Sequence, residues 1–426
     1  MYASQGQPAR TDLGYPDEGP FRYTILPEPF LTHELTRLAS AKSTLLSRPS
    51  ADVRQAKVDS VTFQPCLVEE ESSQDRLVLE DWEDQGALIA VFDGHAGHEC
   101  ADYAKDTLPG MVRASLAQTS SPSPFQTASL LANAITSIDE RIKDDIISLF
   151  PGGESGLDQM SLNEVRHIVN DQDYGGTNHE KVIRGMRGST ALLSLLDSTR
   201  ENLWVANLGD CQAILGTKLP SGEWKTTLLS SCHNGDNERE VQRVRDEHPG
   251  ERQCILNQRV LGALAVTRAL GDHSFKLPPL YTHKVFLNSN PGFRVAAKVQ
   301  EFIARSHTPP YVSSTPEVCH RALESGDRFL ILCSDGLKDL WHDYGANSGA
   351  SAGAGAGNGN GSSVEEEWVK IVGKVMDEDT EENTNFALTL LRESLGGDDP
   401  EKVSRMVTVE MGERWMDDTT IQVVTF

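Results

Sequence analysis

The segment LIAVFDGHAGH, from Leu88 to His98, restricts most strongly how this chain can fold. Its five apolar residues, Leu88 to Phe92, predict a buried strand, because the run is too short for a helix and rich in residues that favour strands. The run ends at Asp93-Gly94-His95. A carboxylate beside a buried strand is costly unless a cation or hydrogen bonds replace the lost water. Taken alone, Asp93-Gly94 is more typical of an ordinary β-turn.

The pattern does not stay isolated. An apolar run also precedes aspartate in RFLILCSDG and in LWVANLGD, and the last segment, DDTTIQVVTF, places its aspartates before the apolar run. In an antiparallel sheet, the end of one strand lies beside the start of the next. We therefore expect one rim to collect four carboxylates: Asp93, Asp210, Asp335 and Asp417. Such a rim needs cations, and hard oxygen donors favour Mg²⁺ or Mn²⁺ over zinc or copper.

Six segments resemble, in order, the motifs of PPM-type (protein phosphatase 2C-like) metal-dependent serine/threonine phosphatases. They are VFDGHAG, RGSTALLSLL, ANLGDCQAIL, RVLGALAVTRALGD, CSDGLKDLW and DDTTIQVV, and the resemblance extends over roughly Val58 to Phe426. Three stretches are most similar to the pyruvate dehydrogenase phosphatase-like branch: HNGDNEREVQRVRDEHPGE, PPYVSSTPEV and DDTTIQVV. The resemblance implies an α+β fold, an α-β-β-α sandwich in which helices flank two antiparallel sheets. It also implies a phosphorylated protein substrate.

The resemblance implies hydrolysis by a water that two Mg²⁺ or Mn²⁺ ions activate, with a third, weaker ion as an option. Asp93 is the candidate bridging ligand, and the other candidate ligands are Asp75, the Gly94 carbonyl, Asp335 and Asp417. Accessory candidates, as ligands or as supports of ligands, are Gln74, Asp210 and Asp418. For Asp210 a plain turn role is the alternative.

His95 is the candidate general acid, because an imidazole with a pKa near neutrality can protonate the leaving seryl or threonyl oxygen. The alternative is a hydrogen-bonded structural histidine. Arg268 and Asp272, in TRALGD, also match the family motif. The alternative is that they form only a structural ion pair.

Several positions depart from the family pattern. Gln74 stands where relatives usually have glutamate, and Glu70 stands where many have a phosphate-binding arginine, so the sequence assigns no phosphate-binding residue. Cys232 and Cys211-Gln212 are further departures. They leave two alternatives open: a catalytically weakened phosphatase-like module kept for binding, and a phosphatase of small phosphorylated metabolites. The acids Glu69 to Glu71 are candidates to compensate for Gln74.

The chain divides into an N-terminal extension, 1–57, partly irregular, and a phosphatase domain, 58–426. The extension has a short helix predicted near Leu31 to Leu46. Two insertions are expected inside the domain: 151–187, a polar loop with a short helix near Leu162 to Ile168, and 346–363, a flexible Gly/Ala/Ser/Asn tract. We also predict a helix from Glu99 to Ala117 interrupted near Pro109, and a three-stranded meander from Ser189 to Leu215.

Composition excludes several functions. The net charge of −24 would repel nucleic acid and anionic membranes. No apolar run approaches the length of a membrane span. The N-terminus lacks the pattern of a secretion signal and, with both signs of charge, matches a mitochondrial transit peptide poorly. Seven cysteines without a CxxC pair favour a reduced, intracellular protein. The mitochondrial matrix follows from the resemblance only, and the cytoplasm is the alternative.

Overall fold

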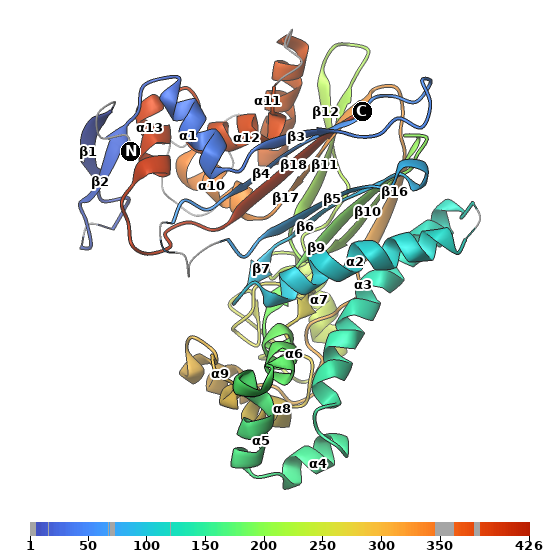
Figure 1. Ribbon diagram of the computed structural model, residues 1–426, viewed down its shortest axis with the longest axis vertical. Coiled ribbons are helices and arrows are strands. Elements are labelled where there is room, and N and C mark those ends of the chain that lie inside the picture. Colours follow the sequence, from blue (N-terminus) through green and yellow to red (C-terminus); the bar gives the residue numbers. More distant parts are fainter. Residues whose placement is uncertain are drawn as a thin grey trace.

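Two antiparallel sheets form the centre of the computed structural model, which describes residues 6–15, 17–66, 68, 73–119, 121–345, 362–378 and 384–426. The five-stranded sheet has, in order, β16 (Glu317–Ala322), β10 (Asn202–Leu208), β9 (Ala191–Leu196), β6 (Ala87–Phe92) and β5 (Arg76–Asp81). The six-stranded sheet has β12 (Trp224–Leu228), β11 (Gln212–Lys218), β17 (Asp327–Cys333), β18 (Thr419–Thr425), β4 (Lys57–Phe63) and β3 (Lys42–Leu45). In Figure 1 the six-stranded sheet lies above the five-stranded sheet.

Strand β6 explains why its sequence is continuously apolar. Successive side chains of a strand point to opposite faces. Leu88, Ala90 and Phe92 pack in a cluster with the outer helices, whereas Ile89 and Val91 pack between the sheets. Both faces of β6 are therefore buried, and a polar residue on either face would lie in an apolar core.

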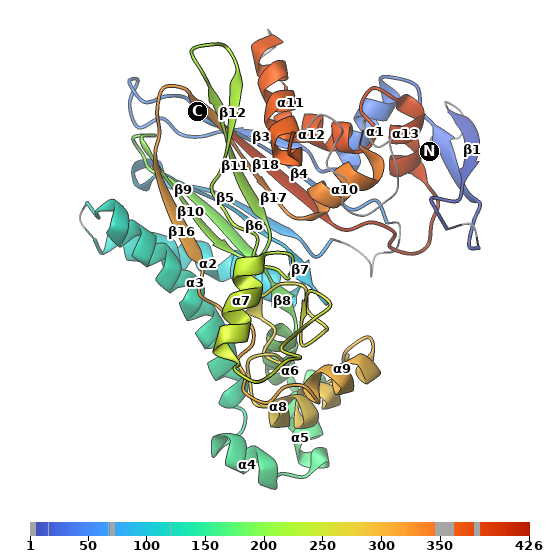
Figure 2. The same cartoon turned by 180° about the vertical axis from the view of Figure 1, so that it is seen from behind.

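Helices cover the outer face of each sheet, as Figure 2 shows from behind. α2 (Glu99–Ala117) and α3 (Pro124–Ile147) pack on the five-stranded sheet. The six-stranded sheet is covered by α10 (Gly336–Tyr344), α11 (Val364–Glu378) and α12 (Phe386–Ser394), with α13 (Pro400–Thr408) and α1 (Phe30–Leu38) beside them. The expected α+β fold class, with antiparallel sheets flanked by helices, is confirmed.

The first 57 residues contribute to this second layer. β1 (Gln7–Thr11) and β2 (Phe21–Ile25) form a hairpin, and β3 pairs with β4. Leu26, Leu31 and Leu35 are buried in the cluster that holds the helices of the six-stranded sheet. α1 ends at Leu38, earlier than the sequence predicts, because the chain then extends to pair with β4.

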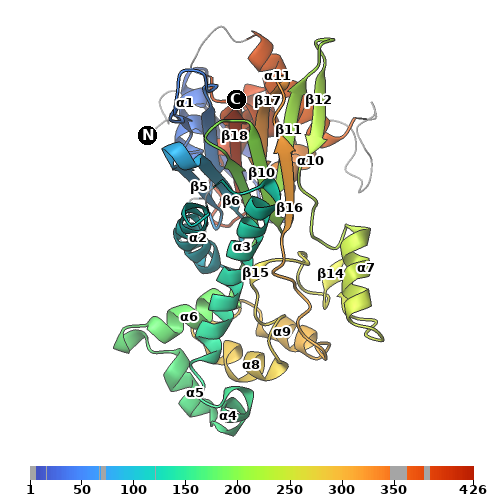
Figure 3. The same cartoon turned by 90° about the vertical axis from the view of Figure 1, so that its right-hand side faces the viewer.

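The prediction for 151–187 was wrong in part. This segment holds α4 (Gly153–Gln159), α5 (Leu162–Val169), the 3₁₀ turn Gln172–Tyr174 and α6 (Thr177–Met186), not a loop with one helix. The predicted short helix is α5, which begins at a capping box formed by Ser161 and Glu164. The segment is polar because each short helix buries only a narrow stripe of apolar residues, and for that reason it was predicted as a loop. Val182 and Ile183 form part of such a stripe in α6. In Figure 3, α4 to α6 lie below the sheets with α8 (Pro279–Lys284) and α9 (Ala296–Ile303).

Two further local predictions were wrong. α2 continues through Pro109, because Leu108, Pro109 and Val112 are buried and packing outweighs the lost hydrogen bond. The expected meander also does not form. β9 and β10 pair, but β11 belongs to the other sheet, so the chain crosses between the sheets at Gly209-Asp210.

Short elements complete the molecule. β7 (Gly94–His95), β8 (Gly188–Ser189) and β15 (Leu270–Gly271) form a small sheet, β13 (Ile255–Leu256) and β14 (Arg259–Val260) form a hairpin, and α7 (Glu238–Glu247) precedes them. 3₁₀ turns cover Glu83–Gln85 and Phe286–Asn288. Of the 346–363 tract, 346–361 lie outside the described residues, as do Glu69 to Glu71. None of the described helices is both long and apolar enough to cross a membrane.

Candidate metal centre

Three aspartates meet where strands of both sheets end. Asp93 follows β6, Asp335 follows β17, and Asp210 lies where the chain crosses between the sheets. Each offers one carboxylate oxygen, and the three oxygens lie within 4.8 Å of one another. We call this set the carboxylate cluster. Of the four aspartates that the sequence predicts at one rim, three therefore lie together in the structure.

Burial and mutual repulsion dominate the electrostatics of the cluster. Burial, followed by the neighbouring carboxylates, raises the pKa of Asp93 and Asp335 well above the ordinary range. Burial also raises the pKa of Asp210, against a hydrogen bond of 3.2 Å from Asn234 Nδ2. Ionised together, these groups repel strongly, and a bound divalent cation would remove that repulsion. The oxygen-only donor set fits Mg²⁺ or Mn²⁺.

Asp75, at the start of β5, supplies a second sign of a cation site. Its residue is 2% exposed, and neither carboxylate oxygen has a hydrogen-bond partner among the described residues. Burial, then the charge of Asp418, raises its pKa to about 7, although the nearby side chains of Ser334 and Thr420 lower it. Its charge in turn raises the pKa of Asp93. A buried carboxylate without partners calls for an explanation, and a metal ion beside the cluster is one that fits.

Asp417 and Asp418 differ from the cluster because they have a counter-charge. Arg414 Nη2 lies 2.9 Å from Asp417 Oδ1 and 2.7 Å from Asp418 Oδ2. Asp418 also accepts hydrogen bonds from the Gln74 backbone N–H at 2.7 Å and from Gln64 Nε2 at 2.9 Å. The Asp417 side chain is 50% exposed and stands outside the three-oxygen set, although its charge still raises the pKa of Asp93 and Asp335.

His95 is held by a second carboxylate. Its Nε2 lies 2.6 Å from Asp272 Oδ2. This close approach requires glycine at position 188 of the paired strand, since a Cβ there would lie 2.0 Å from Nε2. Burial lowers the pKa of His95, but Asp272 outweighs it, so the pKa is raised overall. Arg268 does not pair with Asp272, because it binds Glu240 at 2.6 Å instead.

The Gln74 side chain is held by the loop that follows β7. Its Oε1 accepts a hydrogen bond of 3.0 Å from the Gly97 backbone N–H, just before α2. Gly94 is buried in β7, opposite Ser189. His98 pairs through Nδ1 with Asp102 at 2.7 Å.

The unusual residues near Asp210 are explained by local packing. Cys211 is buried with its Sγ 3.1 Å from Thr190 Oγ1, and Gln212 donates to Glu365 at 2.9 Å. The sequence analysis missed the role of His233, whose Nδ1 accepts the Gly209 N–H at 3.2 Å and fixes the crossing between the sheets. The signal was the segment HNGD, which also supplies Asn234.

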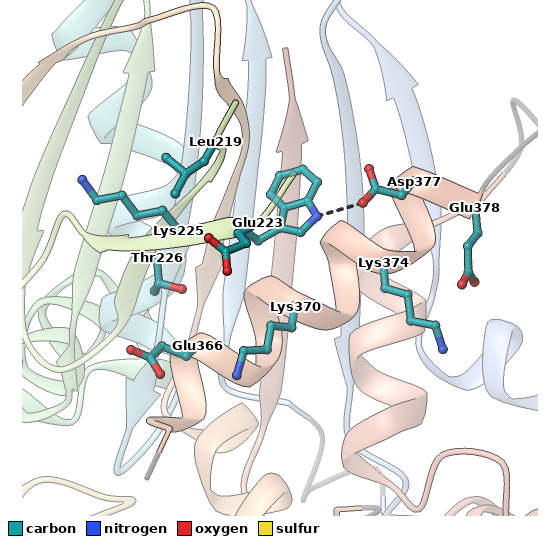
Figure 4. Close-up of a pocket in the computed structure, with 10 residues that line it drawn as sticks. Leu219, Glu223, Lys225, Thr226, Glu366, Lys370, Lys374, Asp377 and Glu378 are labelled. Atoms are coloured by element: carbon teal, nitrogen blue, oxygen red, sulfur yellow. Dashed lines mark hydrogen bonds between the residues drawn. The ribbon is translucent and has the colours of Figure 1, made fainter. Parts of the chain in front are cut away.

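The large hollow in Figure 4 is not part of the centre. It has a volume of about 770 Å³ and lies between β12 and α11. Its walls carry both signs of charge, with Lys370 and Lys374 beside Glu366 and Asp377. A smaller pocket of about 350 Å³ adjoins the cluster, and Asp339, Arg414, Asp417 and Arg294 line it.

The fold and the acidic rim of this chain agree with a known protein family. The family model of Protein phosphatase 2C matches residues 64–347, and the chain belongs to this family of metal-dependent protein serine/threonine phosphatases. It is a phosphoric monoester hydrolase.

The chain is also similar to individual proteins of this family. The chain is 28% identical over 399 residues to the mitochondrial [pyruvate dehydrogenase [acetyl-transferring]]-phosphatase 1 of Homo sapiens, covering 80% of this chain and 73% of that protein. A protein phosphatase 2C homolog of Schizosaccharomyces pombe is 28% identical over 359 residues, covering 79% and 72%. The solved serine-threonine phosphatase 2C of Toxoplasma gondii aligns with a TM-score of 0.46 at 16% identity, over 90% of this chain and 99% of that one.

Proposed function

We propose that this chain hydrolyses phosphoserine or phosphothreonine in a protein with a water activated between two Mg²⁺ or Mn²⁺ ions. The observation that carries the proposal is the carboxylate cluster, whose three acids each bring an oxygen within 4.8 Å of the others, with Asp75 near enough for its charge to raise the pKa of Asp93. When bound, two divalent cations would activate the attacking water and neutralise the phosphoryl oxygens.

The acidic side chains take distinct parts in this proposal. Asp93 would bridge the two ions, because it is the acid whose pKa both Asp335 and Asp75 raise. Asp335 and Asp210 would complete one side, and Asp75 the other. Asp417 would join through its exposed carboxylate, and Gly94 through its carbonyl. Asp418 would hold the Gln74 backbone, as its 2.7 Å hydrogen bond does here.

His95 would act on the leaving group. Its bond to Asp272 uses Nε2, and no hydrogen bond joins Nδ1 to another part of the described chain. The raised pKa favours the protonated form of the ring, which a general acid needs. His95 would donate that proton to the seryl or threonyl oxygen as the phosphorus–oxygen bond breaks.

The relatives suggest a substrate and a location. Those from Homo sapiens and Saccharomyces cerevisiae are named as mitochondrial pyruvate dehydrogenase phosphatases, the latter 30% identical over 287 residues. We propose a substrate of that kind and a location in the mitochondrial matrix. Phosphorylated pyruvate dehydrogenase and an unrelated phosphopeptide, compared as substrates, test the first point.

Purified protein titrated with Mn²⁺ against a phosphopeptide and a generic aryl phosphate tests the reaction. We expect metal-dependent turnover of both. The His95→Gln substitution should lower the rate of phosphopeptide hydrolysis far more than the rate of aryl phosphate hydrolysis, because the aryl leaving group needs no proton. An equal loss on both substrates would contradict the acid role. A flat response of the wild type to Mn²⁺ would contradict the whole proposal.

A catalytically weakened module is the second candidate, favoured by one observation. The Gln74 side chain accepts a hydrogen bond from Gly97 and carries no charge, so it does not give the second ion the negative charge of a glutamate. Under this alternative, Mn²⁺ binds by calorimetry while turnover stays at background.

A further inference from the structure

A buried ion pair lies behind Asp272, the residue that holds His95. Asp139, in α3, is 4% exposed, and its Oδ1 lies 2.8 Å from Nζ of Lys276, whose side chain is also buried. Burial raises the pKa of Asp139, but the charge of Lys276 outweighs burial, so the pKa is lowered overall. A buried ion pair is weak evidence for stability, because the cost of removing two charges from water offsets their attraction. We therefore looked for another use of this pair.

The ion pair binds the backbone just before Asp272 at two points. Asp139 Oδ1 accepts a hydrogen bond of 2.9 Å from the Gly271 N–H, and Lys276 Nζ donates to the Ala269 carbonyl at 2.7 Å. Both contacts are made to the ends of β15, which pairs with β8, and β8 pairs in turn with β7. The pair thus joins α3 to the small sheet that contains the histidine.

The backbone at Asp272 needs such support. Its φ is +50°, which is uncommon for a residue other than glycine. Gly271, with a φ of +71°, has no room for a side chain, because an added Cβ would lie 2.1 Å from the Arg187 carbonyl oxygen. The Asp272 N–H donates to that same oxygen at 2.9 Å. Unfavourable backbone conformations persist only where the surrounding structure over-determines them. The hydrogen bond from Gly271 to Asp139 is part of that determination.

The backbone in turn sets the position of the Asp272 carboxylate, which has little freedom. Its Oδ2 lies 2.6 Å from His95 Nε2, and an added Cβ at Gly188 would lie only 2.3 Å from the same oxygen. The carboxylate is therefore enclosed between the imidazole and β8. A rotation of the peptide between residues 271 and 272 would lengthen the bond to His95 or press the carboxylate against the strand.

We infer that Asp139, together with Lys276, is a positioning residue for proton transfer by His95. It fixes the backbone at Gly271, so that the carboxylate of Asp272 holds the imidazole in one orientation. The partner of one ring nitrogen decides which nitrogen is left to face a substrate, so an error in the carboxylate position becomes an error in the acid. The inference rests on the proposed function, in which His95 protonates the leaving oxygen.

The test measures kcat/KM of Mn²⁺-loaded protein for a phosphopeptide and for an aryl phosphate, whose leaving group needs no proton. Asp139→Ala is made alone and in the His95→Gln background. Asp139→Asn is the conservative variant, because its amide oxygen can still accept the Gly271 N–H. Asp327→Ala is the matched control. Asp327 is also buried and pairs with Arg321 at 3.0 Å, but it begins β17, whereas the carboxylate cluster lies beyond the other end of that strand.

We expect Asp139→Ala to lower kcat/KM for the phosphopeptide about tenfold or more beyond any loss on the aryl phosphate, because a misplaced acid loses part of its catalytic contribution. In the His95→Gln background, the same substitution should add less than about twofold, since Asp139 acts through the histidine. Asp139→Asn should restore part of the difference between the substrates, and Asp327→Ala should change both values by the same factor. An equal loss on both substrates, or an undiminished loss in the His95→Gln background, would overturn the inference.

A second measurement does not depend on turnover or on the folding of Asp139→Ala. It follows, by NMR of the metal-free protein, the ring proton of His95 that is hydrogen-bonded to Asp272. We expect this signal in the wild type and in Asp327→Ala, and its loss in Asp139→Ala and in Lys276→Met. A signal that persists unchanged in Lys276→Met and in Asp139→Asn would overturn the inference. A wild type that shows the signal but has no Mn²⁺-dependent turnover would instead refute the proposed function.

Discussion

The acidic rim has two parts that solve the same electrostatic problem differently. In the carboxylate cluster, oxygens of Asp93, Asp210 and Asp335 lie within 4.8 Å of one another, and burial, followed by repulsion from neighbouring carboxylates, raises the pKa of Asp93 and Asp335. A few residues away, Arg414 stands between Asp417 and Asp418 and neutralises much of their charge. Near Arg414 the protein itself balances the negative charge, whereas in the carboxylate cluster a bound cation must balance it. Substitutions in the two parts should therefore have opposite effects on the metal-free protein.

The largest effect should come from the cluster. Asp93→Asn and Asp335→Asn should each lower turnover at saturating Mn²⁺ by about 10³-fold or more, because bound metal supplies several kcal/mol of transition-state stabilisation. Each should also raise the melting temperature in EDTA, since it removes a repelling charge. Asp158→Asn, at an exposed side chain, is the control. Wild-type turnover in either cluster variant would remove that residue from the metal centre.

The neutralised part should respond in the opposite direction. Arg414→Met leaves Asp418, whose side chain is 2% exposed, without its cation. Breaking a buried pair costs about 3–5 kcal/mol, so urea unfolding of the metal-free variant should show a loss at the lower end of that range. The melting temperature in EDTA should fall where that of Asp93→Asn rises. If both variants move the same way, the two parts of the rim do not differ as described.

Asp75 links stability to pH. Its folded pKa of about 7 lies above the ordinary value, so the stability that the neutral carboxyl contributes is complete below about pH 4 and is lost as pH rises through 7. In EDTA, we expect the melting temperature of the wild type to fall between pH 5 and 8 relative to that of Asp75→Asn. Saturating Mn²⁺ should abolish most of this relative fall. Parallel pH curves in EDTA would mean that Asp75 is compensated by another group.

The smallest effect is expected at Gln74. Relatives usually have glutamate at this position, but here the side chain accepts a hydrogen bond from the Gly97 N–H. A glutamate can accept the same hydrogen bond, so Gln74→Glu should change the Mn²⁺ concentration for half-maximal activity by less than about threefold. A larger decrease would show that the side chain turns to the metal and would bring Gln74 into the cluster.

The same contrast separates what could be read along the chain from what could not. Apolar runs predict β6 and β17 because a strand buried on both faces has no polar positions. Their ends predict Asp93 and Asp335 at one rim. The short helices of 151–187 were missed because narrow apolar stripes in a polar segment resemble a loop.

By itself, the sequence determined the buried strands, the aspartates at their ends and the oxygen chemistry of the rim, because each depends on local burial and residue type, whereas the sandwich followed from the family resemblance. The tertiary structure alone decided how the acids are grouped. Asp210 joins the cluster because the chain changes sheets at Gly209-Asp210, and Asp417 stays outside because Arg414 reaches it. It also brought Asp272 to His95 and Arg187 to Gly97. Such pairings join residues far apart in the sequence, and no local preference encodes which charges will meet.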